Sequence, residues 1–305
     1  MTSPRRPAGP ATRPTRVVLI TGASSGIGRS VALKLAEPGT ALVLAARALA
    51  PLERVARQCR AQGAQTLVRS VDVTDAGRVG ELFQAAEQAY TRVDEVVHCA
   101  AVLAYGRFED VPADVWETAV NTTLGGSAKV ARAALTSFAG RRGNLVFVGS
   151  VVGKIAVPTM SSYVTAKWGL HGLVRTLQIE ARTTPDIHIS LVSPGGVDTP
   201  IYRLAGTYLN RHGSPPPPAV TPDRVADAVI SCLRQPRREN NVGIANPLIV
   251  LGFRLFPALY DALVTPLMTR FALASETVAN TEGNVLHPLG QPDLHSLTPP
   301  DIDRS

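Results

Sequence analysis

The chain has 305 residues, and its 31 Lys and Arg against 24 Asp and Glu give a formal net charge of +7. Apolar residues make up 45% of the sequence and charged residues 18%, which fits a folded globular protein and excludes a mostly disordered one. The charge is uneven, because residues 1–16 hold four arginines and no acid whereas residues 271–305 hold five acids and one arginine. The part between them is only mildly basic, so we expect no nucleic-acid partner.

The N-terminal residues and the cysteines indicate the cellular compartment in which the protein works. Residues 1–15 are rich in Pro, Arg and Thr, which predicts a disordered basic arm. The apolar run Val17–Ile20 that follows is too short for a signal peptide. The cysteines, Cys59, Cys99 and Cys232, stand far apart without a Cys-x-x-Cys pair, which indicates neither a disulfide framework nor a metal site. We therefore expect a cytoplasmic protein with no bound metal.

From Arg16 onward, short apolar runs alternate with amphipathic stretches at helical spacing. Strands are predicted at Val17–Thr21, Ala41–Ala45, Thr66–Val71, Glu95–Cys99, Leu145–Gly149 and His188–Val192. Helices are predicted at Ile27–Ala36, Leu52–Gln62, Ala76–Tyr90, Ala113–Phe138, Ser162–Arg182 and Pro222–Leu233. This alternation with short connections predicts a doubly wound α/β fold, in which a parallel Rossmann-like sheet over residues 16–243 is the middle of three layers.

A glycine-rich turn follows the first predicted strand and leads directly into a helix. Its sequence is Thr21-Gly22-Ala23-Ser24-Ser25-Gly26-Ile27-Gly28. Glycines at such a turn let the backbone turn tightly, approach a pyrophosphate and pack the helix close to the strand. The phosphates would lie at the helix N-terminus, where free N–H groups and the helix dipole favour an anion. The strand–turn–helix context predicts a dinucleotide site rather than a glycine turn without a ligand.

The Thr-Gly-x-x-x-Gly-x-Gly spacing of this turn resembles that of the short-chain dehydrogenase/reductase family in its compact single-domain form. The second strand ends in Ala45-Ala46-Arg47, without the acid that binds the ribose 2′-hydroxyl of NAD. The Arg47 guanidinium can instead pair with a 2′-phosphate, and the resemblance likewise implies NADP(H). A solvent-facing loop arginine is the alternative interpretation. The resemblance also implies that Asp72 and Val73 contact the adenine.

The turn and the resemblance together predict a set of cofactor-binding residues. These are Gly22, Ser24, Ser25, Gly26, Ile27, Gly28, Arg47, Asp72, Val73, Ala100, Tyr163, Lys167, Pro194, Gly195, Val197 and Thr199. One departure from the family pattern follows the fourth strand, where His98-Cys99-Ala100-Ala101 replaces Asn-Asn-Ala-Gly and only Ala100 matches. Since His98 and Cys99 have no partner at ligand spacing, we predict that they have packing roles.

Candidate catalytic residues follow the fifth strand. Ser150 ends that strand, and Tyr163 and Lys167 stand four residues apart on one face of the next predicted helix. An ammonium beside a phenol stabilises the phenolate and lowers the tyrosine pKa from about 10 toward working pH. The resemblance implies catalysis by Ser150, Tyr163 and Lys167, with Asn121 positioning a water. A local helix irregularity would explain the mid-helix Asn121 equally well.

These residues predict an NADP(H)-dependent oxidoreductase that transfers a hydride between nicotinamide and a carbonyl or secondary alcohol. Tyr163 would act as general acid and base, with Ser150 bonded to the same substrate oxygen. A non-catalytic NADP(H)-binding sensor or scaffold is the alternative, although a scaffold has no need of a tuned phenol. Family members often form homodimers or homotetramers, which is also the expectation here.

The C-terminal third of the chain is expected to contain the residues that contact the substrate and an apolar extension. By the resemblance, residues 200–220 form a substrate lid, and their apolar and aromatic side chains indicate a hydrophobic substrate. Residues 244–273 predict an apolar helical extension whose charged residues and prolines argue against a membrane span. The stretch 247–273 either packs over the substrate mouth or a subunit interface, which we favour, or lies on a membrane surface. Residues 274–305 predict a loop or disordered tail.

Overall fold

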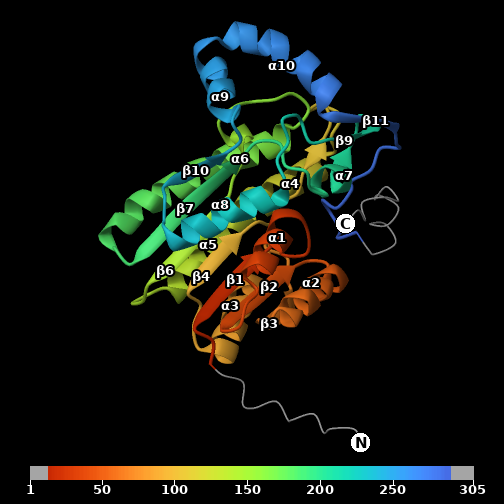
Figure 1. The fold of residues 1–305 in the computed structure, drawn as a ribbon. Coiled ribbons are helices and arrows are strands. Elements are labelled where there is room, and N and C mark those ends of the chain that lie inside the picture. Colours follow the sequence, from red (N-terminus) through yellow and green to blue (C-terminus); the bar gives the residue numbers. More distant parts are fainter. Residues whose placement is uncertain (1–12, 290–305) are drawn as a thin grey trace, which may run out of the picture.

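The computed structural model describes residues 13–289, whose centre is a sheet of seven parallel strands in the order β10-β7-β6-β4-β1-β2-β3 (Figure 1). The strands are β1 Arg16–Thr21, β2 Thr40–Ala46, β3 Gln65–Ser70, β4 Glu95–His98, β6 Gly143–Val148, β7 Ile187–Pro194 and β10 Glu239–Val242. Each of the six neighbouring pairs is parallel. The predicted parallel Rossmann-like sheet is confirmed.

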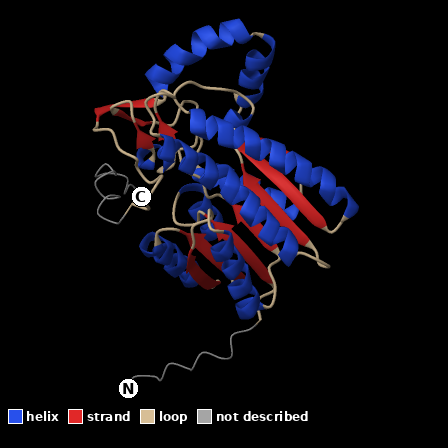
Figure 2. Cartoon of the chain, turned by 180° about the vertical axis from the view of Figure 1, so that it is seen from behind, coloured by secondary structure: helices blue, strands red, loops and turns tan. Residues whose placement is uncertain are grey.

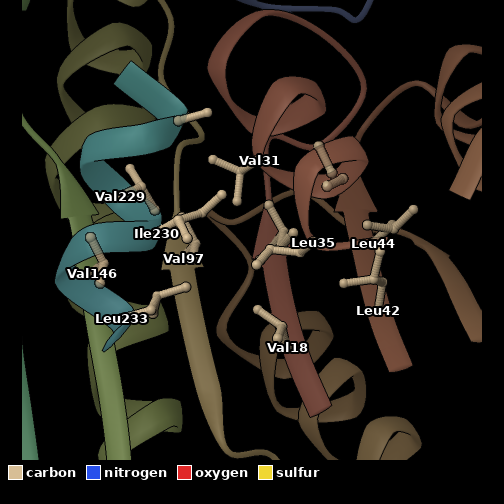
Figure 3. Packing of buried hydrophobic residues seen from close by; sticks show 14 of the residues in the cluster. Val18, Val31, Leu35, Leu42, Leu44, Val97, Val146, Val229, Ile230 and Leu233 are labelled. Atoms are coloured by element: carbon tan, nitrogen blue, oxygen red, sulfur yellow. The ribbon is translucent and has the colours of Figure 1, made fainter. Parts of the chain in front are cut away.

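Six helices cover the two faces of this sheet (Figure 2). On one face lie α1 Gly26–Leu35, α2 Leu49–Ala61 and α8 Pro222–Arg234. On the other lie α3 Ala76–Tyr90, α5 Gly126–Ser137 and α6 Ser161–Glu180. Alternate residues of one strand serve opposite cores, because successive side chains of a strand point to opposite faces. In β1, Val18 packs beneath α1 and α8 (Figure 3), whereas Leu19 packs toward α3.

Two segments differ from the predicted elements. The predicted helix Ala113–Phe138 is interrupted: α4 spans Ala113–Val120, a π-helical turn spans Asn121–Gly125, and α5 follows. The edge strand β10, Glu-Asn-Asn-Val, was not predicted, because its residues lack the apolar pattern of a buried strand. It forms through parallel pairing with β7, and an edge position tolerates such polar residues.

The chain after β10 forms two helices and a short strand. Helix α9 spans Asn246–Leu255 and α10 spans Pro257–Phe271, and together they stand away from the sheet as an arch (Figure 1). We call residues 246–271 the arch. None of the helices within residues 13–289 combines the length and hydropathy needed to cross a bilayer.

Two small two-stranded sheets complete the described fold. β11 Leu273–Thr277 pairs antiparallel with β9 Arg211–Gly213, and β5 Ala104–Tyr105 pairs parallel with β8 Gly206–Thr207. The segment from residue 274, which was predicted as a loop, therefore begins with residues of β11. Its strand conformation depends on pairing with β9, and the sequence of β11 alone does not predict that pairing. The disorder predicted for residues 1–12 and 290–305 lies outside the described residues and stays a prediction.

Candidate active site

A large cavity of about 1110 Å³ opens at the carboxyl ends of the sheet strands. β2 lies on one side of β1 and β4 on the other, so the strand order reverses between β1 and β4. In open α/β sheets, ligands bind at this kind of reversal, outside the carboxyl ends of the strands. The cavity reaches from the glycine-rich turn to the inner side of the arch.

The glycine-rich turn has the shape that a pyrophosphate requires. Gly22 and Gly26 adopt φ values of +68° and +49°, which side chains disfavour. A Cβ on Gly22 would lie 2.8 Å from the backbone nitrogen of Ala100, and one on Gly28 would collide with the Gly22 carbonyl. Ser25 is the N-cap residue of α1, but its side chain makes no hydrogen bond to the first N–H groups of this helix. These groups are therefore available to an anion in the cavity.

The predicted cofactor residues gather around this cavity. Those that line it are Gly22, Ser24, Ser25, Gly26, Ile27, Gly28, Arg47, Asp72, Val73, Ala100, Tyr163, Lys167, Pro194, Gly195, Val197 and Thr199. Thr199 lies against the glycine-rich turn, because a Cβ built on Gly26 would be 3.2 Å from its Cγ2. The loop after β7 thus faces the turn after β1 across the cavity. The Asp72 carboxylate accepts hydrogen bonds from the N–H and hydroxyl of Thr74, at 2.8 and 2.7 Å.

Arg47 is held in place rather than turned to solvent. Its Nη1 donates to the carbonyl of Val285 at 3.0 Å, and its Nη2 donates to the carbonyl of Asn284. Burial lowers the pKa of Arg47, whereas the nearby Asp72 raises it. The backbone after β11 therefore fixes this guanidinium at one end of the cavity, where its remaining N–H groups can meet an anion.

Arg54 is a candidate anion-binding residue that the sequence analysis missed. It lies on α2 and lines the same cavity, and its Nη1 is buried with no hydrogen-bond partner among residues 13–289. One face of α2 lines the cavity, because residues three or four positions apart lie on the same side of a helix. The lining residues of this face are Pro51, Arg54, Val55 and Gln58. An arginine one turn into the helix after Arg47 could have been singled out on this ground.

Ser150, Tyr163 and Lys167 all line the cavity. Ser150 follows β6 and accepts a hydrogen bond from the N–H of Val152 at 3.3 Å. Tyr163 and Lys167 lie one turn apart on α6, with the Lys167 Nζ 5.4 Å from the centroid of the Tyr163 ring. The same Nζ donates to the carbonyl of Val148 at 2.9 Å. The end of β6 and the first turns of α6 thus bring the three side chains together.

Burial dominates the electrostatics of this group. It raises the pKa of Tyr163, which the nearby Tyr202 raises further and the hydrogen bond with Ser150 lowers. It lowers the pKa of Lys167 to about 8, against an opposing effect of Cys99. The pKa of Tyr163 is therefore raised rather than lowered as expected, because burial disfavours the charged phenolate. A protonated phenol results at neutral pH, ready to donate its proton.

The structure does not bring Asn121 to the site. The π-helical turn leaves Asn121 exposed, with its Oδ1 over Gly125, and it is not among the described residues that line the cavity. The adjacent Thr122 is buried and lines the cavity, and its Oγ1 is without a partner within residues 13–289. The π-helical turn thus directs Thr122 rather than Asn121 toward the cavity, and a water-positioning role for Asn121 stays a prediction.

His98 is buried and packs against its neighbours as predicted, whereas Cys99 is half-buried and lines the cavity. The Nδ1 of His98 lies 2.8 Å from the Thr21 hydroxyl, and its ring meets Phe147 edge to face at 5.8 Å. Burial lowers the pKa of His98 to about 3, with a further lowering by Lys167, and burial raises that of Cys99 to about 12. Within residues 13–289, no group of three His, Cys, Asp or Glu side chains could hold a metal ion.

The buried His98 predicts an acid-sensitive fold. Its folded pKa lies below the ordinary value of 6.5, so the unfolded chain binds more protons as the pH falls through 6.5, and stability is lost on the acid side. Between pH 7.5 and 5 the free energy of unfolding should fall by about 2 kcal/mol through this group. Denaturant unfolding at both pH values measures the loss, which His98→Gln should reduce and His287→Gln, at an exposed position, should not. An equal loss in the His98→Gln variant would contradict the assignment.

Comparisons with known proteins place the chain in a family. The family model described as short chain dehydrogenase matches residues 16–207, which is more than half of the chain. The chain belongs to the short chain dehydrogenase family. Among its relatives, the uncharacterized oxidoreductase YxnA of Bacillus subtilis is 29% identical over 90% of this chain and 78% of its own length. A sepiapterin reductase of Chlorobaculum tepidum is 30% identical over 73% of this chain and 91% of its own length.

A solved short chain dehydrogenase has the same fold. The alcohol dehydrogenase from the archaeon Thermococcus sibiricus, complexed with 5-hydroxy-NADP, superposes with a TM-score of 0.64 at 31% identity. That match covers 74% of this chain and 94% of the archaeal one. The family assignment makes the chain an oxidoreductase that acts on CH–OH or carbonyl groups. Since YxnA matches 90% of the chain, this match must include part of the extension after residue 243.

Proposed function

We propose that this short chain dehydrogenase transfers a hydride between NADP(H) and the carbonyl or secondary alcohol of a hydrophobic molecule. The observation that carries the proposal is the placement of Ser150, Tyr163 and Lys167 in one cavity with the glycine-rich turn. The NADP analogue in the archaeal relative supports the cofactor. The residues also fit an additional phosphate, because the end of β2 carries Arg47 and no acid, and Arg54 lines the same cavity with one nitrogen that has no hydrogen-bond partner within residues 13–289.

The side chains of this cavity have distinct parts in the reaction. NADPH, when bound, supplies the hydride that a carbonyl carbon receives. The Tyr163 phenol donates its proton to the carbonyl oxygen as the alkoxide develops, and the Ser150 hydroxyl donates a hydrogen bond to the same oxygen. Lys167 is cationic below pH about 8 and stabilises the tyrosinate left behind. In the opposite direction, Tyr163 accepts the proton of the alcohol.

A substrate panel tests this function. The purified full chain is incubated with NADPH and a series of ketones and aldehydes, and the loss of reduced-nicotinamide absorbance is followed, with NADH in parallel. We expect turnover with a preference for NADPH. Tight NADPH binding without turnover of any carbonyl or alcohol would favour a cofactor-binding sensor or scaffold instead.

The remaining expectations concern organisation and location. We propose that residues 16–243 form the catalytic domain and that residues 1–15 and 244–305 extend it. A homodimer or homotetramer, which the family resemblance implies, stays a prediction. The absence of a disulfide framework supports a cytoplasmic location.

A further inference from the structure

The arch presents a row of large apolar side chains to the cavity. Leu259, Leu263, Leu267 and Phe271 follow one another at intervals of four residues on α10 and all line the cavity. They are 58%, 49%, 51% and 44% exposed, respectively. Twelve residues of α-helix rise about 18 Å, so this row makes an apolar wall of that length. We call these four residues the α10 wall.

The wall offers hydrocarbon contact and almost no polarity. The arch has three charged residues, Arg254, Asp261 and Arg270. None of them is among the described residues that line the cavity. The Tyr260 hydroxyl, at the edge of the wall, donates to the carbonyl of Ala156 at 2.8 Å. Polar groups that can bind a substrate oxygen gather instead around Tyr163 and Ser150.

The arch is tied to the catalytic helix. The Phe253 ring meets Trp168 of α6 at 6.2 Å and Tyr260 at 5.1 Å, both edge to face. Trp168 follows Lys167 in sequence, and its Nε1 donates to the carbonyl of Ile155 at 2.9 Å. Near the far end of α10, Met268 packs against the cluster that also contacts Tyr163. These ties hold the wall at a fixed place relative to the reacting phenol.

The direction of the apolar row decides what it binds. The other side of α10 carries the small or polar residues Ala258, Asp261, Ala262, Thr265 and Thr269, all exposed. Leu248, Leu251 and Leu255 of α9 are exposed and are not among the described residues that line the cavity, whereas the large apolar residues of α10 line it. An occupant of the cavity must therefore cover them, and exposed apolar area of this extent marks a binding surface.

We propose that the α10 wall binds the hydrocarbon chain of a long aliphatic substrate whose oxygen lies at Tyr163. This inference rests on the proposed function for its chemistry, and it adds the substrate class: long-chain ketones, aldehydes or secondary alcohols with a single oxygen function near one end. Leu263, in the middle of the wall, determines the preference for long chains.

A homologous series of methyl ketones tests the wall. With NADPH, kcat/KM of the wild-type enzyme should rise from 2-butanone to 2-dodecanone by up to about fourfold per methylene, which is the effect of burying one CH₂ group. In Leu263→Ser, the ratio of kcat/KM for 2-dodecanone to that for 2-butanone should fall by about tenfold. The matched control is Ala262→Ser, on the outer side of the same helical turn, which should keep the wild-type ratio.

A binding measurement separates this inference from the proposed function. In thermal unfolding, 1-dodecanol should raise the Tm of Leu263→Ser by less than the Tm of the wild type and of Ala262→Ser. A flat ketone series in an active enzyme would overturn the inference and leave the oxidoreductase function intact. If no carbonyl is turned over, the proposed function fails. The dodecanol measurement then tests by itself whether the α10 wall binds a hydrocarbon chain. Equal Tm shifts in wild type and Leu263→Ser would then overturn the inference.

Discussion

The Tyr163→Phe enzyme is expected to lose about a hundredfold to ten-thousandfold in kcat while its Kd for NADPH stays within about twofold. General acid–base catalysis by a positioned side chain contributes roughly 10²–10⁴-fold, and the Tyr163 phenol is hydrogen-bonded with Ser150. The substitution removes a single oxygen and keeps the ring that packs in the cavity. Steady-state reduction of a ketone and fluorescence titration with NADPH measure the two quantities.

Tyr202 provides the matched control for this experiment. It also lines the cavity, and burial raises its pKa to about 12, so it is the second phenol near the reacting position. Tyr202→Phe should lower kcat far less than Tyr163→Phe does. If the two effects were reversed, Tyr202 would be the proton donor, and retained turnover in Tyr163→Phe would refute its role as general acid.

The second large effect concerns the cofactor phosphate. Arg54→Ala should raise the KM for NADPH by roughly tenfold to a hundredfold, since a hydrogen bond to a charged group is worth about 1.5–3 kcal/mol. The KM for NADH should change by less than about threefold, because NADH lacks the 2′-phosphate. Arg47→Ala should act in the same direction, although it also removes the hydrogen bonds to Asn284 and Val285.

Arg57 is the control for the arginine variants. It lies on the same helix as Arg54 but is exposed and is not among the described residues that line the cavity. Arg57→Ala should leave the ratio of the two KM values unchanged, which separates specific binding from the general effect of removing a positive charge. A ratio that is also unchanged in Arg54→Ala and Arg47→Ala would place the phosphate elsewhere.

Much of the fold could be predicted from the sequence because its signals are local. The strand ends and the stops of most helices depend on residues a few positions apart, and the predicted helix Ala76–Tyr90 matches α3 residue for residue. The glycine-rich turn is local in the same sense, since its backbone angles are set by the glycines themselves. The pairing of Tyr163 with Lys167 needed only the spacing of four residues on one helix.

Features that depend on contacts between distant segments could not be predicted. Edge strand β10 exists through its pairing with β7, and β11 through its pairing with β9. The π-helical turn displaces Asn121 from the cavity by adding one residue to a turn, which no periodicity of the sequence marks. The pKa of Tyr163 depends on burial by residues far along the chain, and burial reversed the direction expected from Lys167 alone.

The sequence by itself therefore determined the fold class, the glycine-rich turn and the identity of the three candidate catalytic side chains. Only the tertiary structure decided which surfaces meet them. It brought Arg54 to the same cavity as Arg47 and turned the leucines of α10 toward that cavity. The physical reason is that the spacing of residues fixes which face of a helix is apolar, whereas packing between distant segments fixes what that face opposes.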